Sequence, residues 1–240
     1  MGAPSDTPVA ILCGGRGTRL HGDGAVLAKP MVEIGGTPIV WHVVMSYYAA
    51  GFRRFVLLTG FLGDQVAALA EGGPWPGDAS VQAVDTGVDT PTGGRVAALE
   101  EIIGDETFCL TYADGLTDAD LGALLDEHES SGAVVTLTVV RPRLPFGIVD
   151  VAPDGLVRGF SEKPQASEWV NGGFMCAGPG LFEALDRSGP LEGRPLGELA
   201  AEGKVRASRH DGFWACMDTH KEASMLNGLW ESGEAPWRRW

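Results

Sequence analysis

Residues Val9 to Leu20 read VAILCGGRGTRL, an apolar run followed by a glycine-rich segment. Its apolar start, Val9 to Cys13, has the length and composition of a buried strand. The glycines at 14, 15 and 17 let the backbone come close to a ligand and direct N–H groups at a phosphate chain. Thr18 and Arg19 add a hydroxyl and a fork of N–H donors. The stretch predicts a strand that ends in an anion-binding loop, with a tight turn that binds nothing as the alternative.

The loop matches neither of the two common nucleotide-binding motifs. A Walker motif has Gly-Lys-Ser/Thr directly before a helix, and this loop contains no lysine. The dinucleotide motif GxGxxG does not fit, because the glycines run GGxG and a polar stretch, with no predicted helix, follows. An acidic residue is also missing at the end of the second predicted strand, where Thr59-Gly60 stands. A nicotinamide-dependent dehydrogenase is therefore disfavoured.

The rest of the first half alternates β-rich runs with helical patterns. The predicted strands after the first are Arg54–Thr59, Ser80–Val84, Thr107–Ala113 and Ala133–Val140. Three helices are predicted. The first begins at Pro38, behind a Thr37 N-cap, and ends before Gly51; the other two cover Asp64–Glu71 and Asp118–Ser131. This alternation implies βαβ units and a mostly parallel sheet, with ligands at the carboxyl ends of the strands.

The second half is less regular. The expected elements are a hairpin of Gly147–Val151 with Leu156–Phe160, helices at Gly180–Arg187 and Pro195–Glu202, a strand pair within Val205–Trp214, and a C-terminal helix at His220–Glu231. The chain shows no repeat, low-complexity tract or linker that would divide it. We therefore expect a single domain over residues 1–240.

The amino-acid composition and net charge limit the kinds of partner and compartment expected for this protein. The 240 residues are 44% hydrophobic and carry a net charge of −14, which disfavours nucleic acid as a partner. No apolar run is long enough to span a bilayer, and the segment from Met1 to Pro8 is polar, so we expect a cytoplasmic protein without a membrane partner. The four cysteines contain no CxxC pair and are expected to be reduced.

The order of motifs along the chain resembles that of the sugar-1-phosphate nucleotidyltransferases, most closely the glucose-1-phosphate cytidylyltransferases. The motifs are ILCGGRGTRL (11–20), KPMVEIGGTPIVWH (29–42), DTG (85–87), TGGR (92–95), YADG (112–115), EKP (162–164), NGGF (171–174), GFWACMDT (212–219) and LWESGEAPWRRW (229–240). The resemblance implies a Rossmann-like α/β sheet flanked by helices, with a smaller β-rich sugar-binding portion. Residues 1–140 would form the nucleotide-binding core, and residues 141–240 the sugar-phosphate portion and the C-terminal helix.

The implied reaction is Mg²⁺-dependent transfer of a nucleotidyl group from CTP to glucose 1-phosphate, with release of pyrophosphate. The sugar phosphate attacks the α-phosphorus in line and is already anionic, so no general base is needed. Asp114 and Asp218 would be the Mg²⁺ ligands, since two carboxylates suit this ion. Taken without the resemblance, either aspartate could be a helix N-cap.

The resemblance also implies two sets of binding residues. Arg19, Lys29 and Lys163 would be the catalytic cations: the first two at the triphosphate, Lys163 at the sugar phosphate. The nucleotide would contact Leu12, Gly14, Gly15, Gly17, Thr18, Arg19, Thr92, Gly93, Gly94 and Asp114. The sugar phosphate would contact Glu162, Lys163, Trp169, Asn171 and Gly172. Arg95 could face either the site or solvent, and the C-terminal Ala235-Pro236-Trp237 could fold back on the body or on a neighbouring subunit of a homo-oligomer.

Three departures from the family pattern concern the substrates. The segment from Ala70 to Asp85 is short, Gly24 to Ala28 lacks a basic residue, and Arg194 stands where an acidic residue is expected near the sugar pocket. The same reaction with another nucleoside triphosphate, or with another sugar or cyclitol 1-phosphate, is therefore the alternative. A non-catalytic subunit that binds nucleotide sugars is a more remote one.

Overall fold

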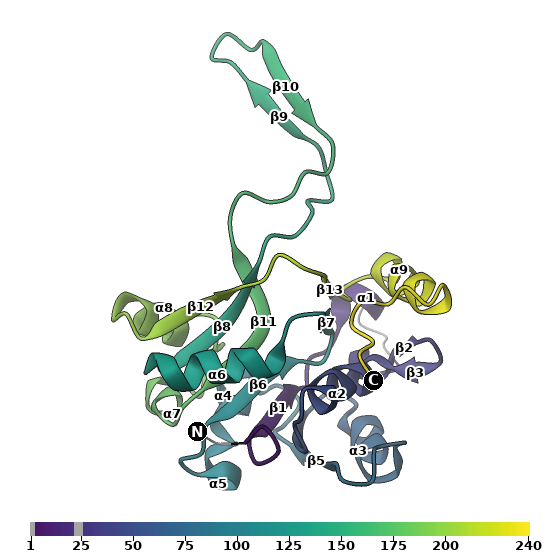
Figure 1. Ribbon diagram of the computed structural model, residues 1–240, viewed down its shortest axis with the longest axis vertical. Helices are drawn as coiled ribbons and strands as arrows, with labels where there is room; N and C mark the ends of the chain where they lie inside the picture. The colour runs from purple at the N-terminus through teal and green to yellow at the C-terminus, as the bar shows by residue number, and fades with distance from the viewer. Residues whose placement is uncertain (1–2, 22–25) are drawn as a thin grey trace.

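The computed structural model describes residues 3–21 and 26–240, which build three layers around a seven-stranded sheet (Figure 1). In spatial order its strands are β12 (Val205–Arg209), β8 (Val135–Val140), β11 (Val170–Ala177), β6 (Phe108–Tyr112), β1 (Pro8–Leu12), β4 (Arg54–Thr59) and β5 (Ser80–Asp85). Every neighbouring pair is parallel except the two pairs that β11 makes, with β6 and with β8. The predicted mostly parallel α/β sheet is confirmed.

The central strand β1 marks the point where the order of strands reverses. It pairs with β4 from Pro8↔Arg54 and with β6 from Val9↔Cys109. The chain runs from β1 outward to β4 and β5, and then returns to β6 on the other side of β1. Such a reversal opens a crevice at the carboxyl ends of the two strands, where α/β proteins bind their ligands.

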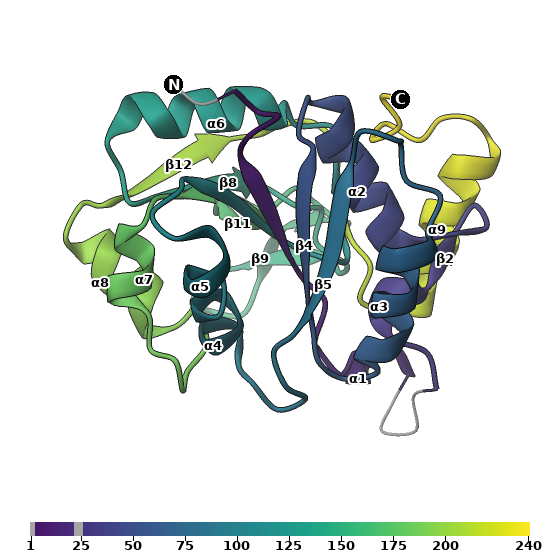
Figure 2. The same ribbon diagram turned by 90° about the horizontal axis from the view of Figure 1, so that it is seen from below.

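Helices cover both faces of the sheet (Figure 2). One face packs against α2 (Ile39–Ala49), α3 (Gly63–Gly72), α6 (Leu121–Ser131) and α9 (His220–Glu231), and the other against α4 (Thr92–Ala97), α5 (Glu100–Ile103), α7 (Gly180–Ala184) and α8 (Arg194–Ala201). Because side chains alternate along a strand, Val9 and Ile11 of β1 pack in the core on the α2 side of the sheet. Ala10 and Leu12 pack in the core on the α4 side. No helix within the described residues is long and apolar enough to cross a membrane.

Several short elements complete the fold. They are α1 (Thr18–His21), the 3₁₀ turn η2 (Lys29–Met31), the pair β2 (Glu33–Ile34) and β3 (Thr37–Pro38), and the pair β7 (Gly115–Thr117) and β13 (Trp214–Cys216). A helical turn therefore does follow the glycine loop, and the expectation of none was wrong because four residues are too few for a periodic pattern. Pro38 precedes α2 as its N-cap and is not its first helical residue.

The strand pair predicted within Val205–Trp214 does not form. Instead, β12 extends the main sheet parallel to β8, and β13 pairs antiparallel with β7. The residues between them are bound to Asp118, whose Oδ1 accepts a hydrogen bond from Phe213 N at 2.6 Å and lies 2.8 Å from His210 Nε2. This side chain turns the chain away from β12 and toward β7.

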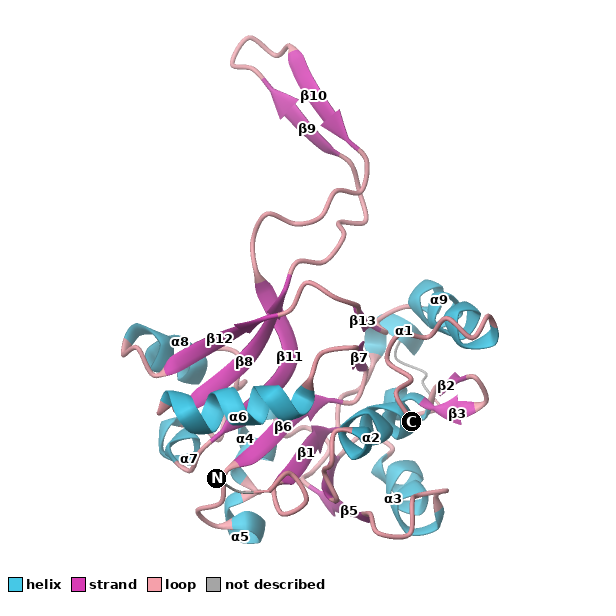
Figure 3. Ribbon diagram, in the orientation of Figure 1, coloured by secondary structure: helices cyan, strands magenta, loops and turns pink. Residues whose placement is uncertain are grey.

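The predicted hairpin does form, as β9 (Ile148–Val151) and β10 (Val157–Ser161), and it projects far from the body on two loop arms (Figures 1 and 3). Its apolar side chains are exposed, among them Val149 at 44% and Phe160 at 65%. The arms leave from the end of β8 and the start of β11. Because β8 and β6 are both antiparallel to β11, the arms rise from the same edge of the sheet as the crevice.

The C-terminal segment folds back onto the body of its own chain. Trp237 is fully buried, stacks on Phe213 and donates from Nε1 to Nδ1 of His42 at 3.3 Å. On the other side of the imidazole, Nε2 lies 2.8 Å from the carbonyl oxygen of Ile34. Since a carbonyl only accepts and an indole N–H only donates, the His42 ring carries its proton on Nε2 and is neutral.

This buried histidine predicts a loss of stability in mild acid. Burial lowers the pKa of His42 from 6.5 to about 4, so the unfolded chain takes up its proton first. Stability that is present above pH 6.5 is lost as the pH falls toward 4, by about 3 kcal/mol in total. Urea unfolding across this range should show the loss in the wild type and a flatter profile in His42→Gln. The same substitution at the exposed His220 should keep the wild-type slope, and equal slopes in all three proteins would contradict the assignment.

Candidate active site

A pocket of about 490 Å³ lies in the crevice at the carboxyl ends of β1 and β6. Four segments line it: the glycine loop after β1, the turn η2, the loop between β5 and α4, and the residues after β6 and β13. The lining residues are Leu12, Cys13, Gly14, Gly15, Arg16, Gly17, Thr18, Leu20, Lys29, Pro30, Val88, Asp89, Thr90, Pro91, Thr92, Arg95, Tyr112, Ala113, Asp114 and Asp218. The glycine loop after β1 and Asp114 after β6 thus meet in one cavity.

Two carboxylates and one ammonium group meet on one wall of this pocket. Asp114 follows β6 and Asp218 follows β13, and the short ladder of β7 and β13 brings them together, with Gly115 opposite Cys216. Met217 N donates to the Asp114 carbonyl at 2.9 Å and extends this ladder. The Lys29 ammonium lies between the carboxylates, donating to Asp218 Oδ1 at 2.6 Å and to Asp114 Oδ2.

Lys29 is held in its charged form. Burial alone would lower its pKa, but the charges and hydrogen bonds of Asp114 and Asp218 outweigh burial and raise the pKa above its ordinary value. The Lys29 side chain is only 13% exposed. One positive and two negative charges leave this wall with a net negative charge, which favours a further cation.

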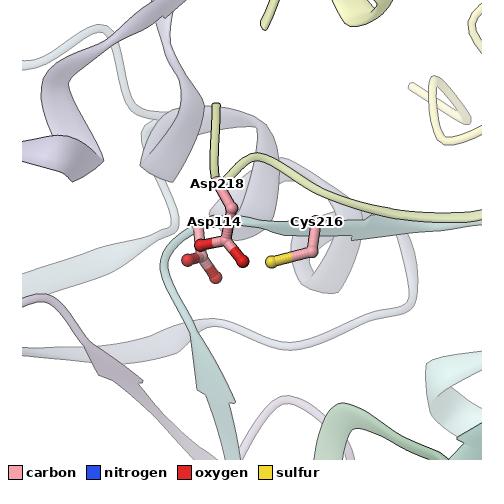
Figure 4. A group of neighbouring side chains, drawn as sticks. All are labelled: Asp114, Cys216 and Asp218. Atoms are coloured by element: carbon pink, nitrogen blue, oxygen red, sulfur yellow. The ribbon is translucent and has the colours of Figure 1, made fainter. Parts of the chain in front are cut away.

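The donor set fits a divalent metal ion. Asp114, Asp218 and Cys216 each offer one ligand atom, and these atoms lie within 4.8 Å of one another (Figure 4). The alternative role of the aspartates as helix caps is wrong: Thr219 caps α9 in a capping box with Glu222, and Asp114 leads into the strand β7. Neither carboxylate caps a helix; both instead accept hydrogen bonds from Lys29 on the wall of the pocket.

The glycine loop is shaped by packing as well as by access to a ligand. Gly14 lies against Arg95, and a Cβ atom at Gly14 would be 2.1 Å from Arg95 Nη1. Gly17 has φ +61°, a conformation that favours glycine. Leu12, Gly15, Gly17 and Thr18, which were expected to contact the nucleotide, line the pocket. The side chain of Arg19 lies outside the described residues, as do Gly24 and Ala25 in the stretch that lacks the expected basic residue.

Arg95 is buried, which decides between the two orientations left open by the sequence. Its Nη1 donates to the Thr59 carbonyl at 2.7 Å and to Thr86 Oγ1 at 2.6 Å, and its Nη2 to the carbonyls of Gly14 at 3.1 Å and Val88 at 3.2 Å. These acceptors lie at the end of β4 and just after the ends of β5 and β1. Arg95 therefore ties together the loops that form one side of the pocket.

Thr92, Gly93 and Gly94, which the resemblance placed at the nucleotide, form the first turn of α4. Thr92 lines the pocket, but the described lining does not include the two glycines. A Cβ at Gly93 would lie 2.6 Å from the carbonyl oxygens of Asp186 and Gly189, and one at Gly94 would lie 2.6 Å from that of Arg187. The glycines are required here by close packing against the loop after α7.

That loop brings in a residue that the sequence analysis missed. Glu192 accepts hydrogen bonds from the Tyr112 hydroxyl and, at 2.7 Å, from Thr92 Oγ1, and so links two residues of the pocket wall. Arg194, expected near the sugar pocket, is instead exposed and pairs with Glu198 at 2.7 Å along α8. The sequence did indicate this region through Arg194, but the side chain beside the pocket is that of Glu192, two residues earlier. Arg194 begins α8 and its side chain faces solvent.

The residues predicted for the sugar phosphate are not all brought to the pocket. Glu162 and Lys163 lie on the outer arm of the hairpin, where Lys163 is 56% exposed and its Nζ is 3.7 Å from Glu162 Oε1. Trp169, nearer the sheet, packs beneath the guanidinium groups of Arg141 at 4.6 Å and Arg209 at 5.5 Å. None of the three belongs to the described lining of the pocket.

Asn171 and Gly172 lie closer, at the start of β11, where an irregularity interrupts the pairing with β8. The Asn171 side chain accepts from Gly173 N at 2.9 Å, and Gly173 has φ +82°. The Gly172 carbonyl accepts a hydrogen bond from Trp214 Nε1 at 2.7 Å. The NGGF motif thus forms a bend in β11 that is bound to β13, next to the aspartate pair.

Comparison with known proteins agrees with this geometry. Residues 9–203 match the family model described as nucleotidyl transferase. The chain is 38% identical to the glucose-1-phosphate cytidylyltransferase of Salmonella typhimurium, over 96% of this chain and 98% of that one. It is 36% identical, with the same coverage, to a Bacillus subtilis protein named "Probable glucose-1-phosphate cytidylyltransferase". The crystal structure of HddC from Yersinia pseudotuberculosis shares the fold, with a TM-score of 0.73 at 20% identity over 93% of this chain and 99% of that one.

Proposed function

Because the chain belongs to the nucleotidyl transferase family and is a sugar-1-phosphate nucleotidyltransferase, we propose that it transfers a cytidylyl group from CTP to glucose 1-phosphate and releases pyrophosphate. Similarity over nearly the whole chain to relatives named for this activity supports the choice of substrates. The observation in the structure that carries the proposal is the cluster of Asp114, Lys29 and Asp218 on the wall of a pocket at the switch point of the sheet.

The chemical task of such a site is to hold two polyanions together. Asp114 and Asp218 would hold a Mg²⁺ ion, which when bound supplies positive charge to the phosphate oxygens. Lys29 and Arg19 would contact the triphosphate and the departing pyrophosphate, and the N–H groups of the Gly14–Thr18 loop would bind phosphate oxygens. Leu12, Thr92 and the Gly93–Gly94 backbone would border the nucleoside. The local cations matter because the protein as a whole carries a charge of −14.

The sugar-phosphate contacts are proposed for Glu162, Lys163, Trp169, Asn171 and Gly172. Since Lys163 lies on the hairpin arm outside the pocket, its contact requires the arm to approach a pocket, in the same subunit or in another one.

We further propose a cytoplasmic homo-oligomer with one functional domain per chain, in which residues 1–140 bind the nucleotide and residues 141–240 the sugar phosphate. The exposed apolar side chains of the hairpin support an assembly, because an isolated two-stranded hairpin is only marginally stable in water.

A matrix of nucleoside triphosphates against sugar 1-phosphates tests the substrates. With Mg²⁺ present, pyrophosphate release should be fastest for CTP with glucose 1-phosphate, with kcat/KM higher than for the other pairs by roughly tenfold or more. Removal of divalent ions with a chelator should stop the reaction, and added Mg²⁺ should restore it. Preference for ATP, GTP, UTP or dTTP, or for a cyclitol phosphate, would replace the substrate assignment and keep the reaction class. Binding of sugar nucleotides without turnover of any pair would contradict catalysis itself.

A further inference from the structure

The partly buried thiol of Cys216 lies beside the two carboxylates. Cys216 and Asp218 are two residues apart in an extended segment, so their side chains point to the same side. Met217 between them points the other way and is fully buried in the core. Figure 4 shows the Cys216 sulfur directed toward the carboxylate of Asp218, with Asp114 on the neighbouring strand end. The β7–β13 ladder therefore presents a sulfur and two oxygen donors together.

The spacing of these donors suits a shared metal ion. Ligand oxygens and sulfurs lie roughly 2.0 to 2.3 Å from ions such as Zn²⁺, so two donors on one ion are separated by about 3 to 4 Å. The three donor atoms here lie within 4.8 Å of one another. A second observation marks the position as one that attracts a cation: the Lys29 ammonium already lies between the two carboxylates, bound to both.

The other cysteines differ from Cys216 in their surroundings. Cys109 and Cys176 face each other in the core between β6 and β11, with sulfurs 3.0 Å apart and no exposed surface. Cys13 is 1% exposed and belongs to the core cluster beneath the sheet. Of the four cysteines, all of which are described, only Cys216 belongs to the group that it forms with Asp114 and Asp218.

We propose that Cys216 is a third ligand of the metal site, so that thiophilic ions such as Cd²⁺, Zn²⁺ and Co²⁺ bind there more tightly than Mg²⁺. The proposal rests on the proposed function for the site itself and adds its metal preference. Thiolate is a soft ligand that selects such ions, whereas Mg²⁺ takes oxygen ligands. On coordination the thiol proton is released to solvent, and the sulfur donates an electron pair to the ion. These ions would compete with Mg²⁺ for Asp114 and Asp218.

Metal titrations of the full-length protein without substrates test this proposal. One equivalent of Cd²⁺ should produce an ultraviolet thiolate-to-metal charge-transfer band in the wild type. The band should be lost in Cys216→Ser, and calorimetry should show Cd²⁺ affinity weakened by roughly 10- to 100-fold or more, with Mg²⁺ affinity unchanged. Cys13→Ala is the matched control, because it removes the buried thiol of another residue that borders the pocket and should keep the band. Asp218→Asn should weaken the binding of both ions.

Two outcomes would overturn the proposal: no charge-transfer band in the wild type, or a band that survives Cys216→Ser. If that variant does not fold, alkylation of the wild type replaces it. Cd²⁺ should protect Cys216 from iodoacetamide, as followed by mass spectrometry of its peptide, and absence of protection would refute metal ligation. Since these measurements use no nucleotide, their failure is distinguishable from failure of the proposed reaction, which would appear as absence of pyrophosphate release with every metal and substrate pair.

Discussion

Replacing Asp114 by asparagine should reduce kcat for pyrophosphate release by roughly 100- to 1000-fold or more, the loss seen when a positioned electrostatic group is removed from an active site. Asparagine has nearly the same volume but lacks the charge that would hold a divalent ion. Lys29 keeps its hydrogen bond to Asp218 Oδ1 at 2.6 Å, so the pocket wall stays in place. The folded state should therefore persist, and urea unfolding should show a two-state transition like that of the wild type.

The matched control is Asp64→Asn, the same chemical change at an exposed position in the first turn of α3. It should leave kcat unchanged. Calorimetry with Mg²⁺ should show weakened binding for Asp114→Asn and wild-type binding for Asp64→Asn. If Asp114→Asn stayed fully active, the assignment of Asp114 to the metal would be wrong, whatever its effect on stability.

The elements predicted well are those whose signals are local. Arg54–Thr59 is an uninterrupted β-forming run and has the predicted bounds in the structure. His220–Glu231 also has the predicted bounds, because Thr219 and Glu222 form a capping box that fixes the helix start within four residues. The glycine loop and the aspartate after β6 could be placed at one edge of the sheet for the same reason, since both directly follow apolar runs.

The elements that were missed depend on contacts distant in sequence. The strand β11 contains Asn171-Gly172-Gly173 directly after its first residue, and these residues disfavour strands; its pairing is set by β6 and β8 on either side. The helix α4 begins with Thr92-Gly93-Gly94. Its two glycines pack closely against the loop after α7, nearly 100 residues later in the chain. No periodicity reports such a contact, so the sequence indicated a nucleotide contact for these two glycines but not their packing against that loop.

In the candidate site, too, local motifs indicated single residues, whereas their contacts depend on distant parts of the chain. Asp114, Asp218 and Lys29 were each named from their motifs, but their direct contact is a product of the β7–β13 ladder and of η2, which are too short to predict. Glu192 was missed because its partners, Tyr112 and Thr92, are 80 and 100 residues away. Lys163 sits in a recognisable motif, yet the arm that carries it leaves the body of the protein, and this direction is set by the ends of β8 and β11.

Removal of the Arg95 guanidinium is expected to have the largest effect on stability near the site. Arg95→Met takes this donor away from four acceptors at or just after the ends of β1, β4 and β5: the buried carbonyls of Gly14 and Thr59, and the part-buried Thr86 Oγ1 and Val88 carbonyl. The free energy of unfolding should fall by about 3 to 5 kcal/mol, as when a buried charged partner is removed. The KM for the nucleoside triphosphate should also rise, because the loops after β1 and β5 line the pocket.

A double-mutant cycle with Gly14 isolates this contact from general damage. Gly14→Ala places a Cβ 2.1 Å from Arg95 Nη1 and forces the guanidinium from its acceptors, so it should destabilise the wild type. In the Arg95→Met background the obstacle is smaller and the hydrogen bonds are already lost, so the same substitution should cost less. We expect a coupling energy of about 1 to 3 kcal/mol from urea unfolding of the four proteins.

Gly36→Ala is the control for backbone strain alone, because a Cβ there would meet nothing within 4 Å but φ is +77°. Its effect should be additive with that of Arg95→Met. Additive effects for Gly14→Ala as well would mean that Arg95 does not hold the glycine loop in place.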